Sequence, residues 1–110
     1  MFTKKELHGY ETVINGIQKK TLVHGDRTLM TEFRLEAGSR LPGHEHSHEQ
    51  TGYLVKGKLR MVVGNADYFV EAGDSWCIPG GVKHSAKALT DAIAIEVFSP
   101  VREDYLPKER

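Results

Sequence analysis

The sequence predicts an all-β protein, folded as a sandwich or barrel. Glycine and proline recur at short intervals, and the runs between them are rich in Val, Ile, Thr, Tyr and Phe. Short runs of this kind, bounded by turn residues, are typical of strands. Helical periodicity is hard to find: only the tail, Val101–Arg110, has room for a turn of helix, and Pro107 limits it.

The predicted strands follow one another along most of the chain. In order they are Ile17–His24, Leu29–Leu35, Gln50–Val55, Lys58–Val63, Tyr68–Glu71, Ser75–Ile78, His84–Ala88 and Ala92–Phe98. Lys56-Gly57 is predicted to form a tight hairpin between two of them, because glycine adopts a positive φ without steric cost. We expect Trp76 to be a core residue rather than a platform for substrate.

Composition limits the classes of function. The 110 residues fit one domain, residues 1–110, and the net charge is zero, so no basic field is available for nucleic acid or an anionic membrane. No stretch approaches the roughly 18 apolar residues of a spanning helix. Cys77 is the single cysteine, which fits a cytoplasmic protein without disulfides, and we expect it to be a small buried residue.

Three of the six histidines crowd into the stretch GHEHSHEQTGYLVKG. His44 and His46 occupy alternate positions, which on a strand point to one face. His48 has the same parity, but a bend is predicted around it. His84 opens a later strand, directly after a rigid turn at Pro79. Surface histidines are the alternative, yet this grouping favours a site for a divalent metal.

The spacing of these residues resembles both motifs of the cupin family. Residues 38–57 match the first motif, G(X)5HXH(X)3–4E(X)6G, and residues 73–88 match the second, G(X)5PXG(X)2H(X)3N, apart from two positions. Gln50 stands in place of glutamate, and Ala88 stands in place of asparagine. The resemblance implies a jelly-roll barrel, the double-stranded β-helix of small single-domain cupins.

The same resemblance implies one divalent transition metal ion held by His44, His46, His84 and the residue at position 50. Glu49 has the wrong parity to replace the missing carboxylate, so we favour the side-chain oxygen of Gln50. Such a ligand shell is neutral and leaves the ion its full charge, which favours Lewis-acid chemistry and an anionic small-molecule substrate. Imidazole suits Zn, Ni, Fe, Mn and Cu alike, so the identity of the metal stays open.

A glutamate interrupts the apolar strand Ala92–Phe98. Glu96 shares its face with small alanines and Phe98, which suits a pocket floor, although a solvent-facing position stays open. Arg102 follows within reach of Glu96 or of a substrate carboxylate, which its planar fork can hold in a bidentate manner. The alternative for Arg102 is a solvated arginine near the end of the chain.

The stretches HEHSHEQ and EVFSPVREDY together resemble the KdgF-type small cupins of pectin degradation. Those enzymes bind a metal through three histidines and a glutamine, and convert ring-form 4,5-unsaturated uronates to linear keto-uronates. The resemblance implies that Glu96 moves a proton, Phe98 shapes the sugar site and Arg102 holds the carboxylate. The acid is usually aspartate, so Glu96 is a departure. Small cupins also pair as homodimers, and we expect Ile17–His24 to take part.

Two other functions stay open from the sequence. One is a redox cupin, a dioxygenase acting on a thiol, diketone or phenol, which iron content and oxygen uptake would reveal. The other is a non-catalytic module that binds a small ligand. The glutamine ligand and the Glu96–Arg102 pair favour the uronate enzyme over the redox cupin.

Overall fold

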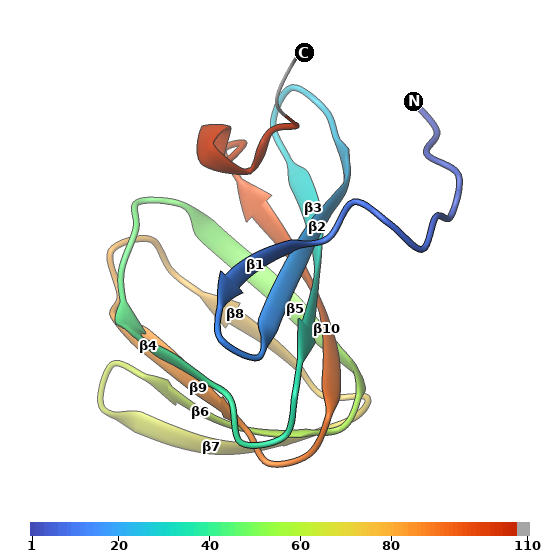
Figure 1. Cartoon of the computed structure of the whole chain (residues 1–110). Helices are drawn as coiled ribbons and strands as arrows, with labels where there is room; N and C mark the ends of the chain where they lie inside the picture. The colour runs from blue at the N-terminus through green and yellow to red at the C-terminus, as the bar shows by residue number, and fades with distance from the viewer. Residues whose placement is uncertain (108–110) are drawn as a thin grey trace.

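Two antiparallel sheets make up the protein in a computed structural model that describes residues 1–107. The larger sheet has the order β1 (Glu11–Ile14), β2 (Ile17–His24), β3 (Leu29–Leu35), β10 (Ala92–Ser99), β5 (Glu49–Lys56) and β8 (Ser75–Ile78). The smaller sheet has the order β4 (Arg40–His44), β9 (His84–Ala88), β6 (Lys58–Val63) and β7 (Ala66–Glu71). The sheets lie face to face as a jelly-roll barrel (Figure 1). The predicted all-β class is confirmed.

Every strand predicted from the sequence is present, with ends that shift by a residue or two. The predicted hairpin at Lys56-Gly57 is wrong, because β5 and β6 belong to different sheets and do not pair. Gly57 instead forms the corner between the sheets, with φ of 93°. A Cβ atom there would lie under 3.0 Å from the backbone of Asp91 and Ala92, so only glycine fits this corner.

The space between the sheets is filled by the inward side chains of both. On β10, alternate residues are buried, and Ile93, Ile95 and Val97 between them face outward. The buried apolar residues are Ile17, Leu29, Phe33, Leu35, Leu54, Leu59, Met61, Val70, Ile78, Ala88, Ala92, Ala94 and Phe98. Four polar residues are buried among them, namely Thr31, Gln50, His84 and Glu96. Three of these four were predicted to be site residues.

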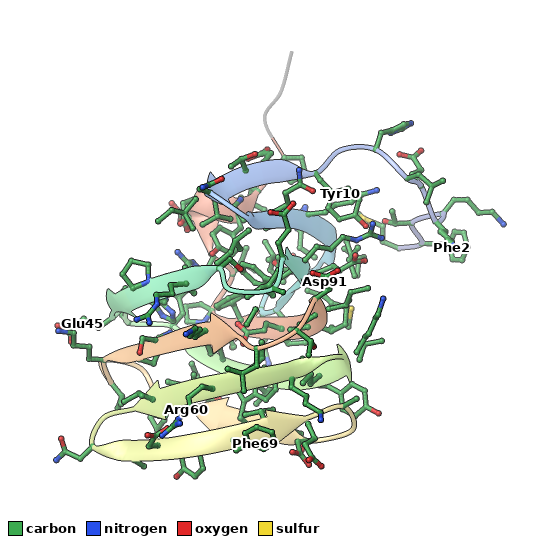
Figure 2. The ribbon with its side chains drawn as sticks, turned by 60° about the horizontal axis from the view of Figure 1, so that its bottom comes forward. Phe2, Tyr10, Glu45, Arg60, Phe69 and Asp91 are labelled. Atoms are coloured by element: carbon green, nitrogen blue, oxygen red, sulfur yellow. The ribbon has the colours of Figure 1, made fainter. Side chains whose placement is uncertain are left out.

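The tail and the surface complete the fold. Part of the predicted turn of helix is present as a 3-10 turn, η1 (Glu103–Tyr105), while residues 108–110 lie outside the described part of the chain. No helix within residues 1–107 has the length and apolar character to cross a membrane. On the smaller sheet, Arg60 of β6 pairs with Phe69 of β7, whose ring is largely exposed (Figure 2).

The expected burial of Cys77 is wrong, since the structure exposes it. On β8, Ile78 is buried and Trp76 is half-buried, so these alternate residues face the barrel. Cys77 has the opposite parity and therefore faces away from the core.

Candidate metal centre

Three imidazoles converge inside the barrel. His44 ends β4 and pairs in register with His84, which begins β9. His46 lies two residues beyond the end of β4, in the loop just before the bend at Ser47 and His48. The ring centroids of His44 and His84 are 4.1 Å apart, and those of His46 and His84 are 5.2 Å apart. One ring nitrogen from each residue lies within 4.8 Å of the other two, a spacing that could hold a metal ion.

The backbone fixes the tautomer of all three histidines. Each Nδ1 contacts a carbonyl oxygen; the acceptors are those of Pro42, His48 and Val82, at 3.0, 3.0 and 2.9 Å from His44, His46 and His84 respectively. A carbonyl only accepts, so each Nδ1 carries the proton and each Nε2 keeps a free lone pair. This is the orientation that metal-binding histidines adopt.

A lowered pKa also favours metal binding at two of these rings. Burial lowers the pKa of the His46 imidazole, and the positive charge of Arg102 lowers it further. Burial likewise lowers the pKa of His84, with the neighbouring His44 and His46 acting in the same direction. Neutral imidazole is the form that coordinates a cation, so both rings stay ready to bind near neutral pH.

Gln50 of β5 is only 4% exposed and lies beside His46. Its Nε2 donates to Oε2 of Glu96 at 2.5 Å. Its Oε1 is buried and, like Nε2 of His46 and Nε2 of His84, has no hydrogen-bond partner within the described residues. Three buried lone pairs without partners are costly unless something satisfies them. A divalent cation does so, and the residues therefore fit a metal ion.

Glu96 lies inside the barrel, so the alternative of a solvent-facing carboxylate is wrong. It is 8% exposed, and its Oε1 accepts a hydrogen bond from Nε1 of Trp76 at 2.8 Å. Burial raises the pKa of Glu96 to about 7, against the lowering effect of the Trp76 and Gln50 hydrogen bonds and of Arg102. A carboxyl group with this pKa exchanges a proton readily near neutral pH. The four residues expected to bind the metal are neutral, but one of them, Gln50, contacts this acid directly.

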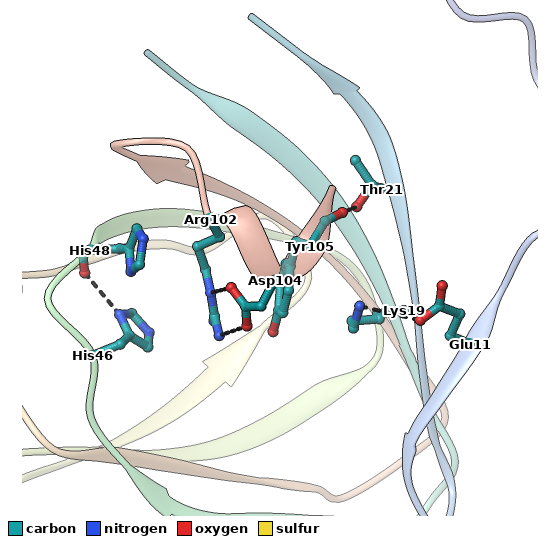
Figure 3. A network of polar contacts seen from close by, with 8 residues as sticks. All are labelled: Glu11, Lys19, Thr21, His46, His48, Arg102, Asp104 and Tyr105. Atoms are coloured by element: carbon teal, nitrogen blue, oxygen red, sulfur yellow. Dashed lines mark hydrogen bonds and ion pairs between the residues drawn. The ribbon is translucent and has the colours of Figure 1, made fainter. Parts of the chain in front are cut away.

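Arg102 is not a solvated tail residue, since its side chain is 14% exposed. Its guanidinium carbon lies 5.0 Å from the ring centroid of Phe98 and 3.9 Å from that of Tyr105. Phe98 in turn contacts His46 edge-on at 5.8 Å between centroids. The fork of Arg102 already binds a carboxylate, that of Asp104, through Nε at 3.2 Å and Nη2 at 2.7 Å (Figure 3).

Tyr105 lies at the same end of the barrel, next to two cationic side chains. Figure 3 shows Tyr105 between Arg102 and Lys19, and the Lys19 amine lies 4.1 Å from the ring centroid. Thr21 donates to the backbone oxygen of Tyr105 and ties η1 to β2. His48, whose role stayed open, supports His46 through its carbonyl oxygen, and its own Nδ1 is buried without a partner inside residues 1–107.

Sequence reasoning missed two contributors to this site. Trp76 packs against the core, as expected, but it also donates to Glu96. Gly52 has the same parity as Gln50 and pairs with both Glu96 and Trp76, so an inward-facing glycine was the available signal. Tyr105, stacked on Arg102, gave no comparable signal.

The fold and the histidine cluster define the class of protein. Residues 31–99 match the family model of the cupin domain, and the chain belongs to the cupin family. KdgF from Halomonas sp. superposes with a TM-score of 0.90 at 30% identity, covering 96% of this chain and 98% of that one. An RmlC-like cupin from Shewanella frigidimarina gives a TM-score of 0.89 at 30% identity, covering 96% and 95%.

A curated relative is similar over part of its length. H2HPP isomerase from Bacillus subtilis is 30% identical over 86 residues, which are 76% of this chain. The match spans only 36% of that protein. Salicylate 1,2-dioxygenase from Pseudoaminobacter salicylatoxidans, at 21% identity and a TM-score of 0.76, shares the fold.

Proposed function

We propose that this cupin opens the ring of a small acidic sugar, a 4,5-unsaturated uronate, to give the linear keto-uronate. The observation that carries the proposal is the proximity of four groups at one end of the barrel. Buried Glu96, Phe98 and half-buried Arg102 come together with the histidine cluster. The likeness to KdgF from Halomonas sp. over nearly the whole chain supports the same reading.

His44, His46 and His84, with Oε1 of Gln50 as fourth ligand, would hold one divalent transition metal ion, such as Zn, Ni, Fe or Mn. The bound ion supplies a Lewis acid that polarises a substrate oxygen. The neutral ligand set leaves its charge undiminished, which suits an anionic sugar.

Glu96 is placed to carry the proton that the reaction relocates. In ring opening the hemiacetal hydroxyl loses its proton, the bond between the anomeric carbon and the ring oxygen breaks, and its electron pair forms an enolate. A proton then returns to the former alkene carbon, so that no atom is gained or lost. A carboxyl with a pKa of about 7 accepts and returns that proton at similar cost.

Arg102 and Phe98 would bind the substrate rather than transform it. The planar fork of Arg102 matches a carboxylate, and Asp104 shows that the fork accepts one in a bidentate manner. Phe98 offers an apolar wall between the guanidinium and His46. Together they would orient the sugar acid with its ring against Glu96.

The experiment supplies unsaturated galacturonate to metal-loaded protein and follows the loss of its enol-ether absorbance. The proposal expects a faster loss than in buffer, reduced at least tenfold in Glu96→Gln. Substitution of exposed Asp67 by asparagine serves as the control, because that carboxylate pairs with exposed Arg60 on the outer surface. Oxygen uptake in place of ring opening would instead support a dioxygenase. Absence of both activities would support a non-catalytic binding module.

We also propose that the chain forms a homodimer, with β2 taking part. Support comes from the outward face of the larger sheet, where Tyr53 is 50% and Val55 is 49% exposed. Light scattering would give a mass about twice 12.3 kDa, and Val55→Asp would lower it towards the monomer value. A monomer at all accessible concentrations would contradict this proposal.

A further inference from the structure

A glycine separates two functional side chains on the inner face of the larger sheet. Gly52 of β5 pairs with Glu96 of β10 on one side and with Trp76 of β8 on the other. Neighbouring strands lie about 4.8 Å apart, so the backbones of Glu96 and Trp76, on either side of β5, are separated by roughly twice that distance. Yet Nε1 of Trp76 reaches Oε1 of Glu96 at 2.8 Å.

The indole reaches Glu96 because Gly52 has no side chain. A Cβ atom on Gly52 would lie under 3.0 Å from Cε2, Nε1 and Cζ2 of Trp76. The ring therefore lies directly over the backbone of Gly52, in space that any other residue would fill. Gly52 is not among the glycines with positive φ, so backbone conformation does not demand it. Close approach of the indole is what demands it.

Hydrogen bonds link this indole to the histidine cluster. Trp76 donates to Oε1 of Glu96, and Nε2 of Gln50 donates to Oε2 of the same carboxylate. With its nitrogen engaged, Gln50 turns Oε1 the other way, where it is buried without a partner in the described chain. When Glu96 is ionised, its carboxylate only accepts and the indole only donates, which fixes the direction of both bonds in the chain Trp76–Glu96–Gln50.

We infer that Trp76 is a positioning residue: its indole, lying over Gly52, holds the Glu96 carboxylate and thereby fixes the Gln50 amide so that its oxygen faces the proposed metal site. This inference rests on the proposed metal site and extends it beyond the direct ligands. It also explains why Gln50 stands where the motif has glutamate. Two facing carboxylates at these positions would repel each other unless one of them kept a proton, whereas the amide of Gln50 donates without needing one.

The chain of bonds makes an unusual prediction for Glu96→Gln. The new amide has one oxygen, which can accept from Trp76 or from Gln50, but not from both at once without crowding. Because the indole has no acceptor, it takes that oxygen and leaves the new NH2 group facing Gln50. The Gln50 amide then reverses, and its NH2 group faces the histidines instead of Oε1.

Removing the indole should therefore rescue Glu96→Gln. In the double variant Glu96→Gln/Trp76→Phe, the new oxygen is free to accept from Nε2 of Gln50, which restores the orientation of Oε1. Gly52→Ala in the Glu96→Gln background displaces the indole by a second route that keeps Trp76. A purely structural role for Trp76 predicts the opposite, namely that each second substitution adds to the damage.

The test is Co2+ titration, followed by calorimetry and by the visible absorption of the bound ion, with no activity needed. Glu96→Gln should weaken Co2+ binding by at least about tenfold, as changes behind direct ligands do. Both double variants should bind at least about threefold more tightly than Glu96→Gln, and exposed Asp67→Asn should bind as the wild type does. Circular dichroism confirms that each variant is folded.

Each outcome decides between the claims. Absence of Co2+ binding by the wild type overturns the proposed metal site, and the inference with it. Binding by the wild type that Glu96→Gln leaves unchanged, or that both double variants weaken further, overturns the role of Trp76 alone. Recovery in either folded double variant supports it.

Discussion

Replacing Gly52 with alanine puts one methyl group where the indole of Trp76 lies. The new Cβ would lie under 3.0 Å from three indole atoms, whereas ordinary contact begins at 3.4 Å. The ring must therefore withdraw by roughly an ångström. Its 2.8 Å hydrogen bond to Glu96 then lengthens beyond the useful range.

The two effects add to a measurable loss of stability. Overpacking costs about 1–3 kcal/mol. Loss of a hydrogen bond to a buried charged group costs about 1.5–3 kcal/mol. We expect Gly52→Ala to lower the free energy of unfolding by about 4 kcal/mol, a large share of the roughly 5–15 kcal/mol of an ordinary domain.

Urea unfolding measures this change, and Trp76, the single tryptophan, reports it by fluorescence. Gly43→Ala is the matched control, because its new Cβ would lie 2.7 Å from Cε of Lys83, near the flexible end of that side chain. That variant should lose less than about 1 kcal/mol. Gly52→Ala with wild-type stability and an unchanged Trp76 emission maximum would refute the placement of the indole over Gly52.

Three further predictions concern pH, substrate affinity and the exposed thiol. In metal-free protein, burial raises the pKa of Glu96 to about 7, so folded protein keeps a proton that the unfolded chain releases near the ordinary glutamate pKa of 4.5. The stability of wild type relative to Glu96→Gln should therefore fall by roughly 3 kcal/mol as pH rises from 4.5 to above 7, and urea titrations that show a constant difference would contradict this. Arg102→Lys should raise KM for the unsaturated uronate about tenfold while leaving Co2+ affinity unchanged, since an ammonium lacks the planar fork; an unaltered KM would remove Arg102 from substrate binding. Cys77→Ser should change the free energy of unfolding by less than about 0.5 kcal/mol, and Cys77 should react with a thiol reagent in folded protein; a protected thiol would contradict its exposure.

Local patterns were sufficient to predict most strands and the inward face of β10. The alternation around Glu96 predicted its burial because side chains of a strand point to opposite faces in turn. The same rule gives Cys77 an outward position on β8, whereas its hydrophobic character alone favours burial, so the expected burial was wrong. Strands β1 and β4 were not predicted. Glu11–Ile14 is short and exposed along its whole length, and Arg40–His44 contains Pro42 and Gly43, which are typical of turns.

Pairing between distant strands was beyond reach of the sequence. Lys56-Gly57 specifies a sharp turn, but the turn does not reveal that β5 and β6 enter different sheets. The link from Trp76 to Glu96 depends on β8 and β10 both flanking β5, which only the register shows. The convergence of His44, His46 and His84 was easier to predict, because the spacing of the two motifs along the chain indicates it.

The most direct test of the metal centre is anomalous diffraction at the zinc edge from crystals of zinc-loaded protein. We expect one peak at roughly 2 Å from Nε2 of His44, His46 and His84 and from Oε1 of Gln50. A peak elsewhere would contradict the proposed metal centre. A zinc ion bound by the histidines with the nitrogen of Gln50 turned towards it would contradict the role of Gln50 as a ligand.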